Sequence, residues 1–221
     1  DGNLEVKARD SILEGNYLYL IAEDLPRNDD DPMEGGGGLG IYDMNDLSAG
    51  PIGYGPNEVW YSLKFMHIDF SRDKVYFTHW SGNGAGVSSH DISDINNPIY
   101  GGDVGAYDYC RFIDVVGDTV YSVTGHMGVI MHDHSDPNLL VQMGDSSTNV
   151  WGVDVENGIG YIATGDDTGG PHFAIEDFSD PNNPTPLGTV SSFSYGPTKD
   201  VIYSNDIVYA VLGSGVATID V

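Results

Sequence analysis

The chain has 221 residues, of which 40% are hydrophobic, and its formal net charge at pH 7 is −26. This length and apolar content are enough for one packed core or one ring of small units. No apolar run approaches the roughly 18–20 residues that cross a bilayer as a helix, so the sequence contains no transmembrane segment. A surface of this charge repels nucleic acids and anionic membranes, which excludes nucleic acid as a partner.

The excess of acidic residues has three explanations. The chain contains 27 Asp and 7 Glu against 4 Lys and 4 Arg. Asp is favoured in β-turns, is a ligand of Ca²⁺, and accumulates on proteins of saline surroundings. Turns take the largest share, but they do not explain the scarcity of Lys and Arg. We therefore expect an extracellular or cell-surface protein. The chain opens at Asp1 without a signal peptide, so a targeting segment has been removed or was never included. The single cysteine, Cys110, excludes an intrachain disulfide framework and fits a core position.

A similar pattern occurs five times with a period near 45 residues, which indicates stacked repeats in a single domain. The units span 1–58, 59–105, 106–147, 148–194 and 195–221. Each has one Asp near the start of its first strand and another at the end of a later strand. The first Asp residues are Asp10, Asp69, Asp114, Asp154 and Asp200. The second are Asp43, Asp91, Asp133, Asp177 and Asp220.

Each unit predicts β-strands in the same order. In unit one, a short run after Asp10 leads to a hairpin turn at 15–16, then to strands at 17–22, 39–43 and 51–55. The later units have hairpin turns at 72–73, 117–118, 157–158 and 205–206. Four of the second Asp residues lead into a Ser/Asn-Asp-(Pro) turn, fullest at 177–184. No helical periodicity is present. These units predict an all-β fold, a β-propeller of about five four-stranded blades.

The repeated runs resemble a known family. Ala8-Arg9-Asp10, followed by 15–19 and 38–43, resembles the LVIVD repeat, with its Ala-Arg-Asp start, its Gly-Asn-Tyr strand and its apolar strand ending in Asp. The resemblance covers essentially the whole chain, with the best copies in units one, three and four. It implies a β-propeller that is secreted or on the cell surface. Since the family is not tied to one reaction, the resemblance implies no catalytic residues.

The fifth unit stops before the turn that leads to a fourth strand in the other units. We therefore expect the last blade to lack its outer strand. A trimmed or swapped closing strand is the favoured explanation, and missing residues or membership of a longer repeat array are the alternatives.

A ligand of a propeller is expected at the axis, where only the innermost strands converge. Basic and aromatic residues near the first Asp of each unit, or in the segments that enter it, predict an axial binding funnel: Lys7, Arg9, Trp60, His67, Tyr109, Arg111, Trp151, Tyr195 and Lys199. Such cations suit carboxylate or sulfate groups, and such rings stack on sugars. The alternative is that the cations pair with the Asp residues of the repeats. The residues before the second Asp residues are rejected as a metal ring, because third strands lie about 10 Å farther out.

Two acidic, Gly-rich loops on one face are candidates for a calcium site. Loop 23–38 contains Asp29, Asp30, Asp31 and Glu34, and loop 165–172 contains Asp166 and Asp167. Neither has the ligand spacing of an EF-hand. The alternative is a mobile acidic loop. A weaker metal hypothesis places a transition metal between His132 and His134, which alternate along one strand.

Two functions remain open. The first is a binding, adhesion or assembly module, stabilised by calcium, with a protein, an extracellular polysaccharide or a second copy as its partner. The alternative is a carbohydrate-active enzyme, a polysaccharide lyase or hydrolase, with its site at the axis. The sequence has no GxSxG motif, which favours the non-enzymatic function. An open axial pocket with His67 and a tyrosine near one point would favour the enzyme.

Overall fold

The computed structural model describes residues 7–23, 37–56, 62–81, 84–106, 110–125, 127–136, 141–146, 149–165, 172–191, 193, 196 and 198–221. Within these ranges the chain forms nineteen β-strands and one short 3₁₀ helix, η1 (Leu47–Ala49). The prediction of an all-β fold is therefore confirmed. In the same ranges, no helix has the length and apolar character needed to span a membrane.

The strands form five antiparallel sheets, which we call blades one to five in chain order. Blade one contains β1 (Lys7–Glu14), β2 (Tyr17–Glu23), β3 (Gly38–Asp43) and β4 (Gly53–Pro56). Blade two contains β5 (Ser62–Asp69), β6 (Lys74–Ser81), β7 (Gly84–Asp91) and β8 (Ile99–Ala106). Blade three contains β9 (Cys110–Val116), β10 (Thr119–Thr124), β11 (Gly128–Asp133) and β12 (Val141–Asp145).

Blade four contains β13 (Val150–Glu156), β14 (Ile159–Thr164), β15 (Phe173–Asp177) and β16 (Thr185–Val190). Among the described residues, blade five contains β17 (Thr198–Ser204), β18 (Ile207–Leu212) and β19 (Gly215–Asp220). This part of the chain forms no fourth strand on β19, in agreement with the expectation from the sequence. Within every blade, the strands are hydrogen-bonded to their neighbours in chain order.

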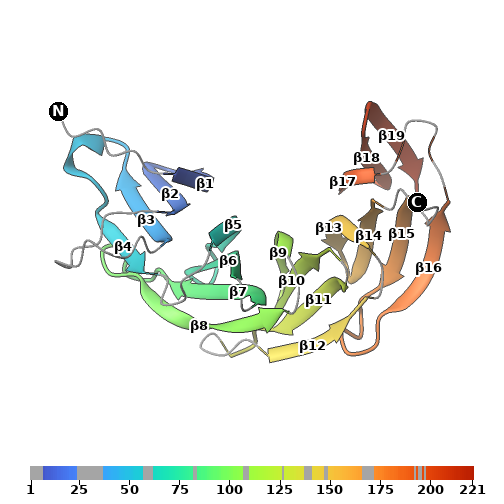
Figure 1. Cartoon of the computed structure of the whole chain (residues 1–221), viewed down its shortest axis with the longest axis horizontal. Helices are drawn as coiled ribbons and strands as arrows, with labels where there is room; N and C mark the ends of the chain where they lie inside the picture. The colour runs from blue at the N-terminus through green and yellow to red at the C-terminus, as the bar shows by residue number, and fades with distance from the viewer. Residues whose placement is uncertain are drawn as a thin grey trace.

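The five blades follow one another along an open arc, with blade one and blade five at its two ends (Figure 1). The first strands of the blades, β1, β5, β9, β13 and β17, lie side by side along the inner edge of the arc. The fourth strands β8, β12 and β16 form its outer rim. The first strands are therefore the innermost, and side chains that they carry can meet.

The Asp residues at the ends of the third strands cap turns, as predicted. In blades one to four, the carboxylate accepts a hydrogen bond from the backbone N–H two residues further on, at 2.7 to 2.9 Å. The residue after each Asp donates its own N–H to the hairpin turn of the same blade, as Phe178 does to Gly158 at 2.7 Å. Asn157 and Gly158 supply the positive φ, 51° and 76°, that this hairpin needs.

The Asp residues predicted to open the units do not share one structural position. Asp10 and Asp200 directly follow a β-bulge in their strands, whereas Asp114 and Asp154 lie two residues farther along. Asp69 is the last residue of β5. The hairpin between β5 and β6 has four residues, 70–73, where the other blades have two, and this shifts unit two. The prediction of equivalent first Asp residues is therefore wrong.

Consecutive blades pack face to face through an aromatic contact. A tyrosine of the second strand contacts a ring of the next blade at all four junctions. The pairs, with the distance between ring centroids, are Tyr19–Phe70 (5.6 Å), Tyr76–His134 (4.8 Å), Tyr121–Phe178 (5.7 Å) and Tyr161–Tyr203 (4.6 Å). Buried apolar clusters that take residues from both blades surround these rings. These junctions fix where each innermost strand lies relative to the next.

We expect Tyr121→Ala to lower the free energy of unfolding by about 3–5 kcal/mol, because it removes a buried ring and leaves a cavity beside Phe178. Tyr209→Ala is the matched control. Tyr209 has the same register position in blade five, but its side chain is exposed, so the loss should be about 1 kcal/mol or less. Urea denaturation of dilute protein measures both values, and equal losses would contradict this account of the junctions.

Two buried histidines make the fold sensitive to acid. Burial lowers the pKa of His79 and of His132 to about 4. His132 lies on β11, with Nε2 3.0 Å from Ser122 Oγ. Between pH 6.5 and 4 the unfolded chain binds protons at these side chains and the folded chain does not. The folded state therefore loses stability as the pH falls through this window, by a few kcal/mol for each histidine.

His132→Gln should reduce this acid destabilisation, because the unfolded chain then has one fewer proton to take up. The buried carboxyl groups with raised pKa, Asp114, Glu176 and Asp200, act in the opposite direction and are unchanged in the variant. The measurement is the free energy of unfolding in urea at pH 7 and pH 4.5, for both proteins. The same decrease in wild type and variant would show that His132 is not a source of the effect.

A candidate ligand-binding pocket on the innermost strands

A β-bulge interrupts the first strand of every blade at the same register. The bulge leaves one residue of the strand out of the pairing with the second strand, or two in blade two. The unpaired residues are Arg9, Lys64 with Phe65, Arg111, Trp151 and Lys199. Four blades thus place a cation at the bulge, and blade four places a tryptophan there. Bulges re-aim a side chain and often lie next to functional sites.

The bulges concentrate positive charge in a very acidic protein. Arg9, Lys64, Arg111 and Lys199 are half of the eight Lys and Arg residues in the chain, whose net charge is −26. In blades one, three, four and five, the second-strand tyrosine follows the bulge residue by ten positions; in blade two the longer hairpin makes it twelve. The position of these residues is therefore a property of the repeat.

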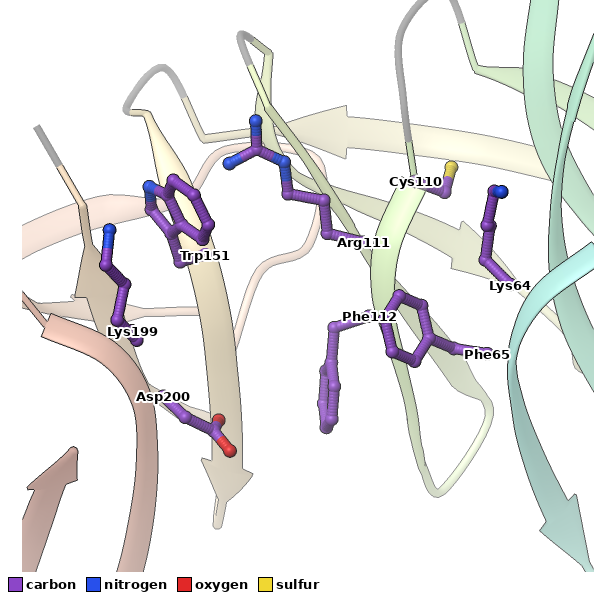
Figure 2. Close-up of a pocket in the computed structure, with 8 residues that line it drawn as sticks. All are labelled: Lys64, Phe65, Cys110, Arg111, Phe112, Trp151, Lys199 and Asp200. Carbon is purple, nitrogen blue, oxygen red and sulfur yellow. The ribbon is translucent and has the colours of Figure 1, made fainter. Parts of the chain in front are cut away.

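The bulge residues of blades two to five line a pocket of about 530 Å³ (Figure 2). The other lining residues, Cys110, Phe112 and Asp200, are neighbours of the bulge residues on the same strands. The volume is in the range of sites that hold small molecules. The pocket thus combines three cations and three aromatic rings with one carboxyl group.

Trp151 lies between two cations. Arg111 Cζ is 4.2 Å and Lys199 Nζ is 3.8 Å from the centroid of the indole ring, and Figure 2 shows the two side chains on either side of it. Each cation–π contact contributes about 0.5–2 kcal/mol. The indole therefore holds two like charges close together at the pocket. Its faces are covered by these cations, so the rings left to contact a sugar are those of Phe65 and Phe112.

Glycines on adjoining strands leave room for these side chains. A Cβ atom on Gly165 would overlap Trp151 Cδ1, and one on Gly125 would lie 3.0 Å from Arg111 Nη2. These two glycines occupy the same position in the repeat, directly after β14 and β10. A Cβ on Gly152 would come within 2.7 Å of Asp200 Oδ1. The backbone around the pocket is therefore fitted to the side chains that line it.

Carboxyl groups follow the bulges along the same strands. Burial raises the pKa of Asp200, and Asp154 raises it further. Burial also raises the pKa of Asp114, although His67, with Nδ1 3.4 Å from Asp114 Oδ1, opposes the change. A carboxylic acid with a raised pKa can hold a proton nearer to neutral pH than an exposed one.

Two of these Asp residues connect neighbouring blades. Asp154 Oδ2 accepts a hydrogen bond from the backbone N–H of Tyr203 at 2.6 Å, which joins blade four to blade five. Asp10 Oδ2 accepts one from the backbone N–H of Met66 at 2.9 Å, which joins blade one to blade two. The role of these carboxylates in the fold is thus to hold innermost strands together.

Of the predicted funnel residues, the structure brings together Arg111, Trp151 and Lys199. Arg9 has the same register position in blade one, outside the pocket lining. His67 pairs with Asp114, away from the lining residues. Trp60, Tyr109, Tyr195 and the side chain of Lys7 lie outside the described residues.

The predicted metal ligands are not described by the structure. Asp29, Asp30, Asp31, Glu34, Asp166 and Asp167 all lie outside the described ranges, so the calcium site stays a prediction. In the described part of the chain, no three His, Cys, Asp or Glu side chains are grouped to hold a metal ion. His132 contacts Ser122, whereas His134 contacts the hydroxyl of Tyr76. These two histidines therefore have different partners in the described part of the chain.

Lys64, Phe65 and Phe112 line the pocket, but the sequence did not identify them as site residues. Lys64 was not recognised as equivalent to the other cations because unit two was aligned on Asp69, which is five residues beyond it. When the units are aligned on the second-strand tyrosines, with an allowance for the longer hairpin, Lys64 is equivalent to Arg9, Arg111 and Lys199. The two phenylalanines carry no sequence signal of their own, because an aromatic residue on a strand is usually part of the core.

No protein-family model matches the chain, and no curated protein matches its sequence. The LVIVD resemblance therefore stays a prediction.

Solved structures share the fold. The chain is similar to the computationally designed Ika8 protein, with a TM-score of 0.69, 10% identity, and coverage of 96% of this chain and 57% of that one. It is also similar to KlHsv2 with loop 6CD replaced by a Gly-Ser linker, at TM-score 0.59, 10% identity and coverage of 98% and 63%. A Bacteroides uniformis protein provisionally assigned as a 6-phosphogluconolactonase matches with TM-score 0.63, 11% identity and coverage of 92% and 67%. The chain thus spans only part of the length of these proteins, and identities this low show the fold alone.

We expect Gly165→Ala to displace Trp151 from its place between Arg111 and Lys199, because the added methyl group overlaps the indole. The emission of Trp151, assigned by comparison with Trp151→Phe, should shift. Gly105→Ala is the control, since a Cβ there meets open space. An unchanged spectrum in Gly165→Ala would contradict the described packing of the indole.

Proposed function

We propose that this chain is a binding module that holds an acidic saccharide in the pocket on its innermost strands, and that its blades form part of a β-propeller ring around that pocket. The observation that carries the proposal is the cluster of Lys64, Arg111 and Lys199, supplied by three different blades. Ligand sites of such folds are formed where repeated units converge, and a fitted pocket with few polar groups is the usual form of a small-molecule site.

The distribution of charge supports an anionic ligand. The rest of the surface of a chain with net charge −26 repels anions, whereas this pocket gathers three of its eight cations. Arg111 can bind a carboxylate or sulfate through two parallel N–H bonds, and a lysine adds a point charge. A partly enclosed pocket makes such charge-assisted bonds stronger than they are in water. The specificity of the pocket should therefore be for the acidic group.

The apolar lining supports a ligand in which the acidic group is attached to a sugar ring. Phe65 and Phe112 lie on adjacent innermost strands, below the cations in the view of Figure 2. Aromatic rings pack against the apolar face of a sugar, while the hydroxyl groups point to water or to polar side chains. A uronate residue of a polysaccharide combines a carboxylate with such a face. The function that follows is attachment to an acidic polysaccharide outside the cell, in keeping with the acidic composition.

A carbohydrate-active enzyme is the second candidate, and one observation favours it. Asp200 lines the pocket, and its pKa is raised by burial and by Asp154, as suits a group that donates a proton. A polysaccharide lyase or hydrolase would use it beside the cations. The pocket lining contains no histidine or tyrosine, so the arrangement that would favour the enzyme over the binding module is not formed by the described residues. Release of new chain ends from polygalacturonate, lost in Asp200→Asn, would establish the enzyme.

We expect a galacturonate trisaccharide to bind the chain, and Lys199→Ala or Arg111→Ala to weaken binding about tenfold or more, because each removes a charge-assisted hydrogen bond. Raising the salt concentration should also weaken binding. Isothermal titration calorimetry measures these affinities.

Arg72→Ala is the matched control for the loss of one positive charge. Arg72 lies outside the pocket, where it bonds Asp69 at 3.1 Å and also contacts Asp118. Its removal should leave the affinity nearly unchanged once folding has been verified. Equal affinity for a neutral galactose trisaccharide, or equal weakening in Arg72→Ala, would contradict the proposal.

A further inference from the structure

One face of blade five is apolar and uncovered. It consists of Ile202 on β17, Tyr209 and Val211 on β18, and Val216 on β19. Ile202 pairs with Tyr209, and Val211 pairs with Val216, so the four side chains share one side of the sheet. We call this the open face of blade five. The opposite face packs on blade four, through Val201, Val208 and Ala210 among others.

The equivalent face of every other blade is covered by the next blade. Tyr209 is 40% exposed, whereas the tyrosines at its position in blades one to four, Tyr19, Tyr76, Tyr121 and Tyr161, are 5%, 0%, 4% and 7% exposed. Val216 is 64% exposed, and its counterparts Leu39, Val87, Val129 and Phe173 are 0%, 0%, 0% and 1% exposed. The repeat therefore gives blade five the side chains of a junction.

Blade one has the complementary face, and it too is uncovered. Leu13 on β1 is 58% exposed, although Ile68 and Val155, at its position in blades two and four, are buried. Met44, which follows β3, is 41% exposed, while its counterparts Ile92, His134 and Phe178 are buried against the preceding blade. We call this side the open face of blade one. It has the features of a surface that receives a preceding blade.

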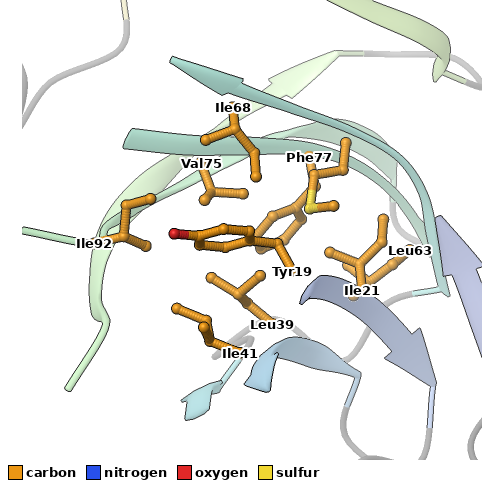
Figure 3. Packing of buried hydrophobic residues seen from close by; sticks show 10 residues of the cluster. Tyr19, Ile21, Leu39, Ile41, Leu63, Ile68, Val75, Phe77 and Ile92 are labelled. Carbon is orange, nitrogen blue, oxygen red and sulfur yellow. The ribbon is translucent and has the colours of Figure 1, made fainter. Parts of the chain in front are cut away.

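The junction between blades one and two shows how such faces fit. Tyr19, Ile21, Leu39 and Ile41 of blade one interlock with Leu63, Ile68, Val75 and Phe77 of blade two (Figure 3). The side chains on the open face of blade five stand at the register positions of Tyr19, Ile21 and Leu39. On the open face of blade one, Leu13 occupies the register position that Ile68 has in blade two. The two open faces therefore match as the two sides of an existing junction do.

We propose that the open face of blade five binds the open face of blade one in a second copy of this chain, head to tail. The two open faces of one molecule lie at opposite ends of the open arc (Figure 1). The complementary face for each is therefore that of another copy. Such a heterologous contact closes a ring or continues as a chain of copies. Burial of exposed Ile, Leu, Tyr and Val side chains stabilises it.

The contact has a consequence for the pocket. Within the chain, neighbouring blades bring their bulge residues together, as Trp151 and Lys199 show at 3.8 Å. The same geometry between copies places Arg9 of the partner subunit next to Lys199. Association would thus add another cation to the anion pocket. Because every copy carries a charge of −26, association should strengthen as salt screens the repulsion between copies.

The 221-residue chain tests the contact by sedimentation equilibrium over a range of concentrations. We expect reversible association, weakened about tenfold or more by Val216→Asp, because a charge would be buried in an apolar junction. Ile99→Asp is the control: Ile99 is 60% exposed, but it lies on β8 at the outer rim of blade two. This variant should associate like the wild type. A wild-type chain that stays monomeric at high salt and high concentration overturns the proposal.

Chemical cross-linking then identifies the faces. Tyr209→Cys and Leu13→Cys are made in separate chains, at the positions that correspond to the stacked pair Tyr161–Tyr203. A short bismaleimide should join the two variants when they are mixed, and neither variant to itself. If a chain with both substitutions forms only an internal cross-link, blade five closes on its own blade one and the proposal is wrong.

Discussion

The packing of one blade on the next, centred on the second-strand tyrosine, determines how the innermost strands and the pocket are arranged. Each junction places a ring of one blade against a ring of the following blade, at centroid distances of 4.6 to 5.7 Å. Because the bulge lies at the same register relative to the tyrosine in every blade, the junction also sets the position of the bulge. Four bulges are thereby aligned side by side, and a pocket forms from residues that are distant in the sequence.

Both the charges of the pocket and the space around its side chains determine what it can bind. Like charges on neighbouring strands repel, and Trp151 reduces that cost by offering both faces of its indole to Arg111 and Lys199. Gly125 and Gly165 provide the space that these side chains need. The three cations of the pocket repel one another, and binding of an anion between them would relieve this repulsion. The same acidity separates copies of the chain, which makes their association dependent on salt.

The sequence was sufficient for the all-β fold, the five repeated units, the turn-capping Asp residues and the missing strand of the last blade, because period, turn residues and strand patterns are local signals. It was not sufficient for the register of unit two, since two extra residues in the hairpin at 70–73 place Asp69 two positions beyond the equivalent of Asp114 and Asp154. Arg111, Trp151 and Lys199 were predicted because charge and aromatic residues stand out near the repeat Asp. Phe65 and Phe112 were not, because the sequence does not show whether an aromatic residue on a strand lines a pocket or packs in the core, and Phe112 does both.

The bulge residues are proposed to form a site for an acidic saccharide. The most direct measurement is the NMR resonance of the Trp151 indole N–H during titration with a galacturonate trisaccharide, and in parallel with its neutral galactose counterpart. We expect a saturable shift with the acidic sugar, which needs about tenfold or more higher sugar concentration in Lys199→Ala and is absent with the neutral sugar. An indole resonance that does not move with the acidic sugar, or that moves equally with both sugars, would contradict this proposal.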